Sequence, residues 1–172
     1  TVLGYTAAVS TYLQRLVDYN NWANRELLAF LATVPPEALD ARAQGVYGSI
    51  RETLAHLLSS EHSYHRHLTK QPRSTDPAPT APALSELVVM AESSAANLEA
   101  LVDALPPPDE FLPLWDGRRA AATVFTQLIT HSAEHRTQVH TILGSLGVEP
   151  PDLDSWAHGI RVHGDDPPPA GD

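Results

Sequence analysis

The stretch TQLITHSAEHRTQVHTILG, residues 126–144, decides the fold because it joins a helical apolar pattern to three histidines. Apolar side chains recur there and beside it at spacings of three and four residues, the period of an amphipathic helix. They are Phe125, Leu128, Ile129, Val139, Ile142, Leu143 and Leu146. Gly147 suits a helix C-terminus, and prolines follow at once. The pattern predicts a helix from near Ala121 to about Leu146.

The same period predicts three earlier helices, over residues 6–33, 50–69 and 84–105. Pro35-Pro36 ends the first of them, and a run of three prolines from Pro106 ends the third. The second opens on Ser49 with Glu52 three residues later, which is the pattern of a capping box. Each helix therefore has a start or stop signal of its own.

The connections between these helices are long. Residues 71–82 hold four prolines and predict a surface loop. Residues 111–119 are mixed, with a turn at Trp115-Asp116-Gly117 and room for a brief extended piece. From Pro151 onward the chain reads as irregular. Long connections either help to build a site at one end of the molecule or are merely tolerated.

Four long helices without a convincing alternating strand predict an all-α protein, a four-helix bundle with long connecting loops. A chain of 172 residues of which 42% are hydrophobic is large enough for one such core. We expect a single domain over residues 1–160, followed by a disordered tail rich in Pro and Asp over residues 161–172.

Composition excludes several function classes. The formal charge of -10 disfavours binding to nucleic acid or to an anionic membrane surface. The chain has no cysteine, which rules out disulfides, thiolate metal sites and a cysteine nucleophile. No apolar run approaches the roughly 20 residues needed to cross a bilayer, and the first residues do not resemble a secretory leader. We expect a cytoplasmic protein with no membrane or nucleic-acid partner.

His131 and His135 are the most informative pair among nine histidines. Residues four apart lie on one face of a helix, one turn apart, which is a metal-chelating spacing. Both flank the predicted apolar face and should point toward the bundle interior. An inward imidazole needs a hydrogen bond or a metal, so the pair is either a metal site or two core or boundary histidines with satisfied hydrogen bonds.

A third ligand would have to come from another helix, and the second helix offers His56 as the best candidate. Its weakness is its helical phase, because it falls on the serine face of that helix and away from the leucines. The other six histidines read as surface or boundary residues: His62, His65, His67, His140, His158 and His163.

Three converging imidazoles would suit one first-row divalent ion, and the ligand set does not distinguish Zn, Ni, Mn and Co. Such a site leaves coordination positions open for water or a substrate, which favours chemistry over a structural role. Binding should weaken at low pH because a protonated imidazole cannot ligate.

With these histidines in place, the chain resembles a known family, the DinB/YfiT-like superfamily of metal-binding four-helix bundles, which includes bacillithiol and mycothiol S-transferases and relatives of maleylpyruvate isomerase. The resemblance runs from Tyr12 to Asp154. It rests on four segments in order: YNNWANRELL from Tyr19, IRETLAHLLSSEHSY from Ile50, HSAEHRTQ from His131 and LGVEPPDLD from Leu146. The third of these is the most specific.

The resemblance implies that His56, His131 and His135 are the metal ligands. The sequence departs from the family pattern at Thr137, where the family often has glycine. A larger side chain there would narrow the approach to the fourth helix. The family name refers to DNA-damage induction in some members and implies no DNA contact.

The resemblance implies a metal-dependent enzyme that activates a low-molecular-weight thiol for S-transfer to a small electrophile. The alternatives are a metal-dependent hydrolase or a non-catalytic metal-binding protein of a stress response. The resemblance makes a homodimer plausible for each of these functions. Glu61, Glu134 or Arg136 could serve as a base or an anion anchor, or could simply be surface charges. No residue can be assigned a catalytic role from the sequence alone.

Overall fold

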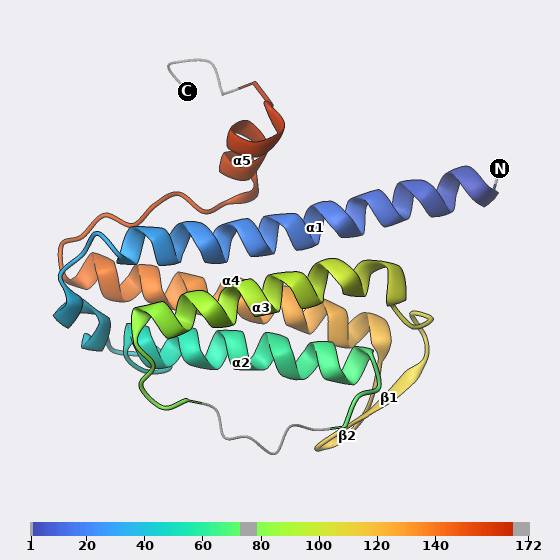
Figure 1. Ribbon diagram of the computed structural model, residues 1–172, viewed down its shortest axis with the longest axis horizontal. Coiled ribbons are helices and arrows are strands. Elements are labelled where there is room, and N and C mark those ends of the chain that lie inside the picture. Colours follow the sequence, from blue (N-terminus) through green and yellow to red (C-terminus); the bar gives the residue numbers. More distant parts are fainter. Residues whose placement is uncertain (1, 73–78, 167–172) are drawn as a thin grey trace.

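The computed structural model describes residues 2–72 and 79–166, and side chains from Thr11 onward within that part. Four long helices lie side by side (Figure 1), which confirms the predicted four-helix bundle. They are α1 Val2–Leu31, α2 Ile50–Leu68, α3 Leu84–Leu101 and α4 Ala121–Ser145. None of the helices in the described part is long and apolar enough to span a membrane.

Helices α1 and α2 each pack against both α3 and α4, so α4 is a direct neighbour of α2. Two apolar clusters fill the space between the helices. One centres on Leu27, Leu57 and Ile142, and the other on Leu98 and Leu128; all five side chains are fully buried. Burial of each such side chain contributes about 1.5–3 kcal/mol, so these clusters supply the main stabilisation of the bundle.

Shorter elements occupy the connections. A 3₁₀-helix, η1, spans Pro36–Asp40, and a second one, η2, extends α3 over Val102–Ala104. Strands β1, Phe111–Leu114, and β2, Gly117–Ala120, form an antiparallel hairpin. The hairpin turns at Trp115-Asp116, where the sequence indicated a turn, and Gly117 follows with a positive φ of 139°.

The prediction of an irregular chain after Pro151 is wrong for residues 155–163. Helix α5, Ser155–His158, continues into a π-helical turn, Gly159–His163. Asp154 caps α5 by accepting a hydrogen bond from the Ala157 backbone N–H at 2.7 Å. So short an element shows no apolar period, which is why the sequence pattern missed it.

Two other expectations fall partly on residues outside the described part. The predicted tail of residues 161–172 begins inside the π-helical turn, and its last six residues, 167–172, are not described. In the proline-rich connection, residues 73–78 are likewise outside the described part.

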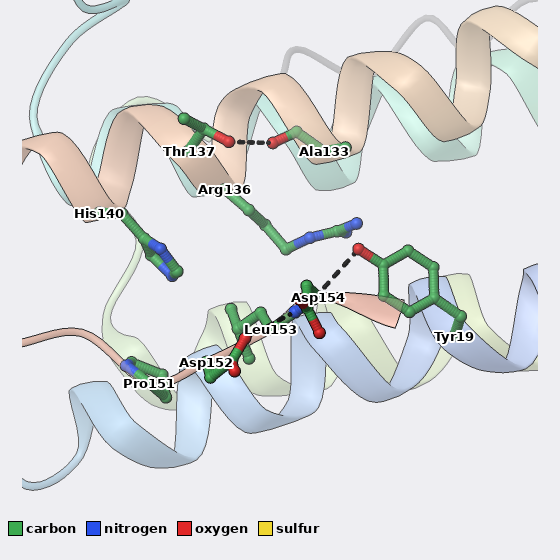
Figure 2. Close-up of a pocket in the computed structure, with 9 residues that line it drawn as sticks. All are labelled: Tyr19, Ala133, Arg136, Thr137, His140, Pro151, Asp152, Leu153 and Asp154. Atoms are coloured by element: carbon green, nitrogen blue, oxygen red, sulfur yellow. Dashed lines mark hydrogen bonds between the residues drawn. The ribbon is translucent and has the colours of Figure 1, made fainter. Parts of the chain in front are cut away.

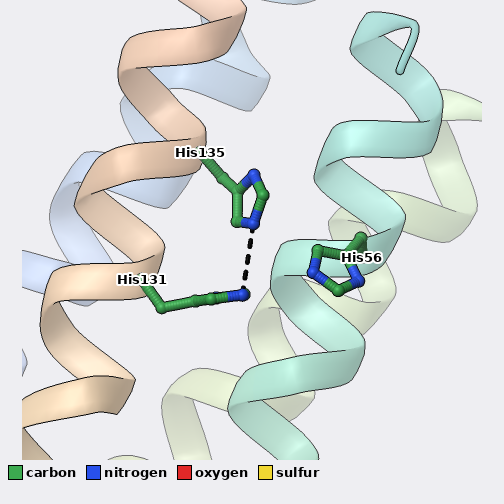
Figure 3. Close-up of side chains that lie close together, drawn as sticks. All are labelled: His56, His131 and His135. Carbon is green, nitrogen blue, oxygen red and sulfur yellow. Dashed lines mark hydrogen bonds between the residues drawn. The ribbon is translucent and has the colours of Figure 1, made fainter. Parts of the chain in front are cut away.

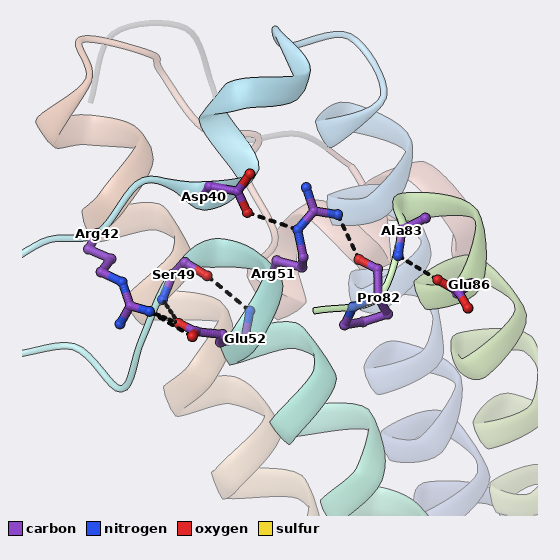
Figure 4. A network of polar contacts seen from close by, with 8 residues as sticks. All are labelled: Asp40, Arg42, Ser49, Arg51, Glu52, Pro82, Ala83 and Glu86. Carbon is purple, nitrogen blue, oxygen red and sulfur yellow. Dashed lines mark hydrogen bonds and ion pairs between the residues drawn. The ribbon is translucent and has the colours of Figure 1, made fainter. Parts of the chain in front are cut away.

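A polar network joins the start of α2 to its neighbours (Figure 4). The predicted capping box is present, since Ser49 Oγ accepts from the Glu52 N–H at 3.2 Å and Glu52 Oε2 accepts from the Ser49 N–H at 2.7 Å. Arg51 donates to Asp40 Oδ1 at 2.9 Å and to the Pro82 carbonyl at 2.6 Å. One arginine therefore ties the start of α2 to η1 and to the segment that leads into α3.

A buried carboxylate joins all four long helices. Glu61 of α2 has no exposed surface. Its Oε1 accepts from Asn20 at 2.7 Å and Asn24 at 3.0 Å, both on α1, and from Ser132 of α4 at 2.8 Å. Its Oε2 accepts from Ser94 of α3.

Arg136 of α4 completes this Glu61 network. Its guanidinium is 3% exposed and donates to Asn20 Oδ1 at 2.9 Å and to Asn24 Oδ1 at 2.8 Å. The two asparagines thus bridge a buried negative charge and a buried positive charge. Since Ser132 and Arg136 come directly after His131 and His135, the network sets the rotation of α4 and with it the direction of both histidines.

Replacing the capping serine should test the start of α2. We expect Ser49→Ala to lower the free energy of unfolding by about 1 kcal/mol, because the backbone N–H of Glu52 loses its acceptor. Urea denaturation monitored by circular dichroism measures this loss. Ser49→Thr keeps the hydroxyl and serves as the control, and equal destabilisation by both variants would contradict the capping role.

Removing the carboxylate of Glu61 should destabilise the protein far more than removing the Ser49 cap. We expect Glu61→Ala to lower the free energy of unfolding by about 3–5 kcal/mol, because it leaves Arg136 as a buried charge without its counter-charge. Glu134→Ala, an exposed position on α4, should change it by no more than about 0.5 kcal/mol. Similar values for the two variants in thermal or urea unfolding would show that the buried network contributes little.

Candidate metal centre

The structure brings together the three histidines singled out from the sequence. His56 projects from α2 toward His131 and His135 of α4 (Figure 3). The Nε2 atoms of His131 and His135 lie 3.2 Å apart, and one ring nitrogen from each of the three side chains lies within 4.8 Å of the others. This arrangement could hold a metal ion.

Helix geometry and helix packing each contribute to this cluster. His131 and His135 lie one turn apart on α4, so their proximity is local. His56 joins them because α2 packs directly against α4. The helical phase that weakened the case for His56 places its ring at the edge of α2, half-buried, 5.1 Å from the His131 ring and 4.8 Å from the His135 ring between centroids.

Burial keeps these imidazoles neutral. It lowers the pKa of His131 from 6.5 to about 4, with a further contribution from neighbouring His135 and His56. Burial also lowers the pKa of His56 and of His135. A neutral imidazole has a free lone pair at neutral pH, which is the form that ligates a metal.

Gln138 determines which nitrogen of His135 carries the proton. Its Oε1 accepts from the backbone N–H of Tyr47 at 3.1 Å, so this amide atom acts as an acceptor. The same oxygen lies 3.0 Å from His135 Nδ1, which must therefore donate its N–H. The lone pair of His135 is then on Nε2, the atom that faces His131.

Aromatic side chains border the three histidines. The Tyr47 ring stacks on His56 with centroids 4.2 Å apart and an interplanar angle of 15°. On the other side, Tyr64 meets His131 edge-on at 5.8 Å and lies 6.5 Å from Trp115 of the hairpin turn. The connection of residues 41–49 thus reaches the cluster through Tyr47, whereas the hairpin contacts only Tyr64 beside it.

The donor set fits a divalent ion. Metal–nitrogen bonds of about 2.0–2.1 Å in tetrahedral geometry place ligand nitrogens roughly 3.3 Å apart. The Nε2 atoms of His131 and His135 already have about this separation at 3.2 Å, and His56 completes the set within 4.8 Å. A small rotation of the rings would close the site around one ion.

The sequence did not single out Tyr47, Tyr64 or Gln138. The sequence could have indicated Gln138, because it lies three residues after His135 and shares its helix face. It could not have indicated Tyr47, since this residue lies in a connection and reaches His56 only through the packing of α2 on α4.

Two of the six other histidines were placed wrongly. His65 is 8% exposed and His158 is 5% exposed, so neither is a surface or boundary residue. His65 belongs to the inward face of α2, and His158 packs on Trp22 and Tyr19 of α1. His62, His67 and His140 are half-buried and His163 is exposed.

The charged residues considered as a base or an anchor also differ from expectation. Glu61 and Arg136 are neither surface charges nor metal-facing groups, because they belong to the buried Glu61 network. Glu134 is exposed. Thr137 donates to the Ala133 carbonyl at 3.0 Å and lines a cavity on another face of α4, so it does not narrow the approach to the histidines.

Gln138 offers a test of this geometry. We expect Gln138→Ala to weaken binding of Zn²⁺ about 10- to 100-fold, because His135 loses the acceptor that selects its tautomer. Gln138→Glu keeps an acceptor and should bind at least as tightly as the wild type. Competition with a chromophoric chelator measures both affinities, with Gln14→Ala on α1 as the control. Equal affinities for the wild type and Gln138→Ala would contradict this role.

Comparison with known proteins agrees with the fold. No curated protein matches this chain in sequence. Among solved structures, a DinB-like protein, YjoA, from Bacillus subtilis superposes with a TM-score of 0.56 at 13% identity, over 86% of this chain and 98% of that one. The model of the DinB family matches residues 8–161. The chain therefore belongs to the DinB family.

Proposed function

We propose that this chain is a divalent-metal-dependent enzyme that activates a low-molecular-weight thiol for S-transfer to a small electrophile. One observation carries the proposal: three ring nitrogens lie within 4.8 Å of one another, and two of the three histidines are only half-buried. Three protein ligands with a side open to solvent are typical of catalytic metal sites, whereas structural sites are closed.

The proposed chemistry needs a metal ion bound by the histidines and a thiol supplied by the substrate. When bound, a divalent ion supplies Lewis acidity that lowers the pKa of a coordinated thiol. The sequence has no cysteine, so the nucleophilic sulfur must belong to the substrate. In the transfer, sulfur forms a bond to the electrophilic carbon, the leaving group departs with its electron pair, and the thiol proton passes to solvent.

The chain's own residues have binding and orienting roles. Gln138 holds His135 in the tautomer that presents Nε2. Tyr47 covers one face of His56 while 56% of its own surface is exposed, so it offers an apolar wall to a substrate beside the histidines. Glu61 and Arg136 are committed to the buried network and are not available as a base at the cluster.

Metal content is the first test of this function. Protein purified without an affinity tag should contain about one divalent ion per chain by elemental analysis. His56→Ala, His131→Ala and His135→Ala should each lose it. His62→Ala removes another half-buried histidine of α2 and should keep it. Wild-type protein that takes up neither zinc, nickel, cobalt nor manganese would overturn the proposal.

Activity then separates the proposed reaction from its alternatives. The loaded protein should conjugate a small thiol to a generic electrophile, and a chelator should abolish this turnover. Hydrolysis of the electrophile without thiol consumption would indicate a metal-dependent hydrolase. Tight metal binding with neither activity across a thiol panel would indicate a non-catalytic metal-binding protein.

A further inference from the structure

A cavity of about 280 Å³ lies beside α4 (Figure 2). Its walls come from α4, from Tyr19 of α1 and from residues 151–154. His140, in one wall, lies nine residues after His131, and at 3.6 residues per turn this places the two on opposite sides of the helix. The cavity is therefore separate from the candidate metal centre.

Two residues of the α4 wall each have a buried polar atom without a partner. Arg136 is 3% exposed, and while its Nη1 donates to Asn20 and Asn24, its Nη2 has no hydrogen-bond partner in the described part of the chain. His140 Nε2 is buried and unpartnered in the same way. Buried polar groups are normally satisfied, so these two indicate a missing hydrogen-bonding partner.

The opposite wall is acidic. Asp152 Oδ1 accepts from the Asp154 backbone N–H at 3.1 Å, and Asp154 Oδ1 accepts from the Ala157 backbone N–H at 2.7 Å. Each bond engages one carboxylate oxygen and fixes the direction of its side chain. A second oxygen on each residue can accept from a ligand.

The two walls select against simple ions. A lone anion that reached Arg136 would lie beside the carboxylates of Asp152 and Asp154, and a lone cation would lie beside the guanidinium. A ligand that carries both charges can turn its carboxylate toward Arg136 and its ammonium toward the aspartates. The volume of about 280 Å³ is near the lower limit of small-molecule sites, which suits a compact ligand.

We propose that this cavity is a second binding site of the protein, specific for a small zwitterion, an α-amino acid. The ligand carboxylate accepts from Arg136 Nη2 and from the Nε2–H of His140, and its ammonium donates to Asp152 and Asp154. Tyr19, whose hydroxyl donates to the Leu153 carbonyl at 3.1 Å, holds the acidic segment against α1 and so keeps the two walls facing each other. This site does not depend on the proposed thiol-transfer function.

Titration of the isotope-labelled protein with L-serine, monitored by amide chemical shifts, tests the proposal. L-Serine should shift the amide signals of residues 133–140 and 152–154. Propionate and isopropylamine each carry one of its two charged groups and should bind at least tenfold more weakly. The response should survive EDTA treatment, which prevents the amino acid from acting as a ligand of an ion held by the histidines.

Variants locate the binding without disturbing the buried network. Asp152→Asn and Asp154→Asn keep an oxygen acceptor but lose the charge, and each should weaken L-serine binding at least tenfold. Thr137→Phe fills the cavity from an exposed position and should abolish binding. The control Thr130→Phe changes an exposed threonine of α4 that makes the same type of bond to its own helix, and it should bind as the wild type does.

Several results would overturn the proposal. No shift with L-serine, a response abolished by EDTA, or propionate or isopropylamine binding as tightly as L-serine would each do so. Undiminished binding by Thr137→Phe would place the ligand elsewhere. Arg136 is left unchanged because its loss would disturb the Glu61 network and confuse binding with unfolding.

Discussion

The Glu61 network is the constraint on which the rest of this structure depends. A carboxylate with no exposed surface is stable only because side chains from the other three long helices donate to it and Arg136 balances its charge across two asparagines. Apolar clusters on their own tolerate small rotations of a helix. Hydrogen bonds have a defined direction and do not tolerate such rotations. This network therefore fixes how the four helices face one another.

Helix α4 is the element that this constraint affects most. Ser132 and Arg136 point into the core network, while the residues just before each of them, His131 and His135, point toward α2. His140 and Thr137 lie on a further side of the helix and line the cavity. One helix thus serves the core, the candidate metal centre and the second cavity, because residues one apart differ by about 100° around the axis.

Much of the candidate site could be predicted from the sequence because its strongest signal is local. The spacing of His131 and His135 determines their proximity on any helix. The family resemblance then implied His56, whose helical phase alone argued against it. Gln138 shares a helix face with His135, but its role depends on the backbone N–H of Tyr47, a residue 91 positions away in the chain.

The sequence by itself determined the four long helices, the capping box at Ser49 and the hairpin turn, because apolar period, caps and turn residues act within a few positions. Only the tertiary structure decided that Glu61, His65 and His158 are buried, that α5 forms, and that Tyr47 stacks on His56. The burials and the Tyr47 stack depend on contacts between segments distant in the chain, and α5 adds to its local cap the packing of His158 on α1. Local propensity carries no information about such contacts, because burial and pairing are properties of the packed bundle.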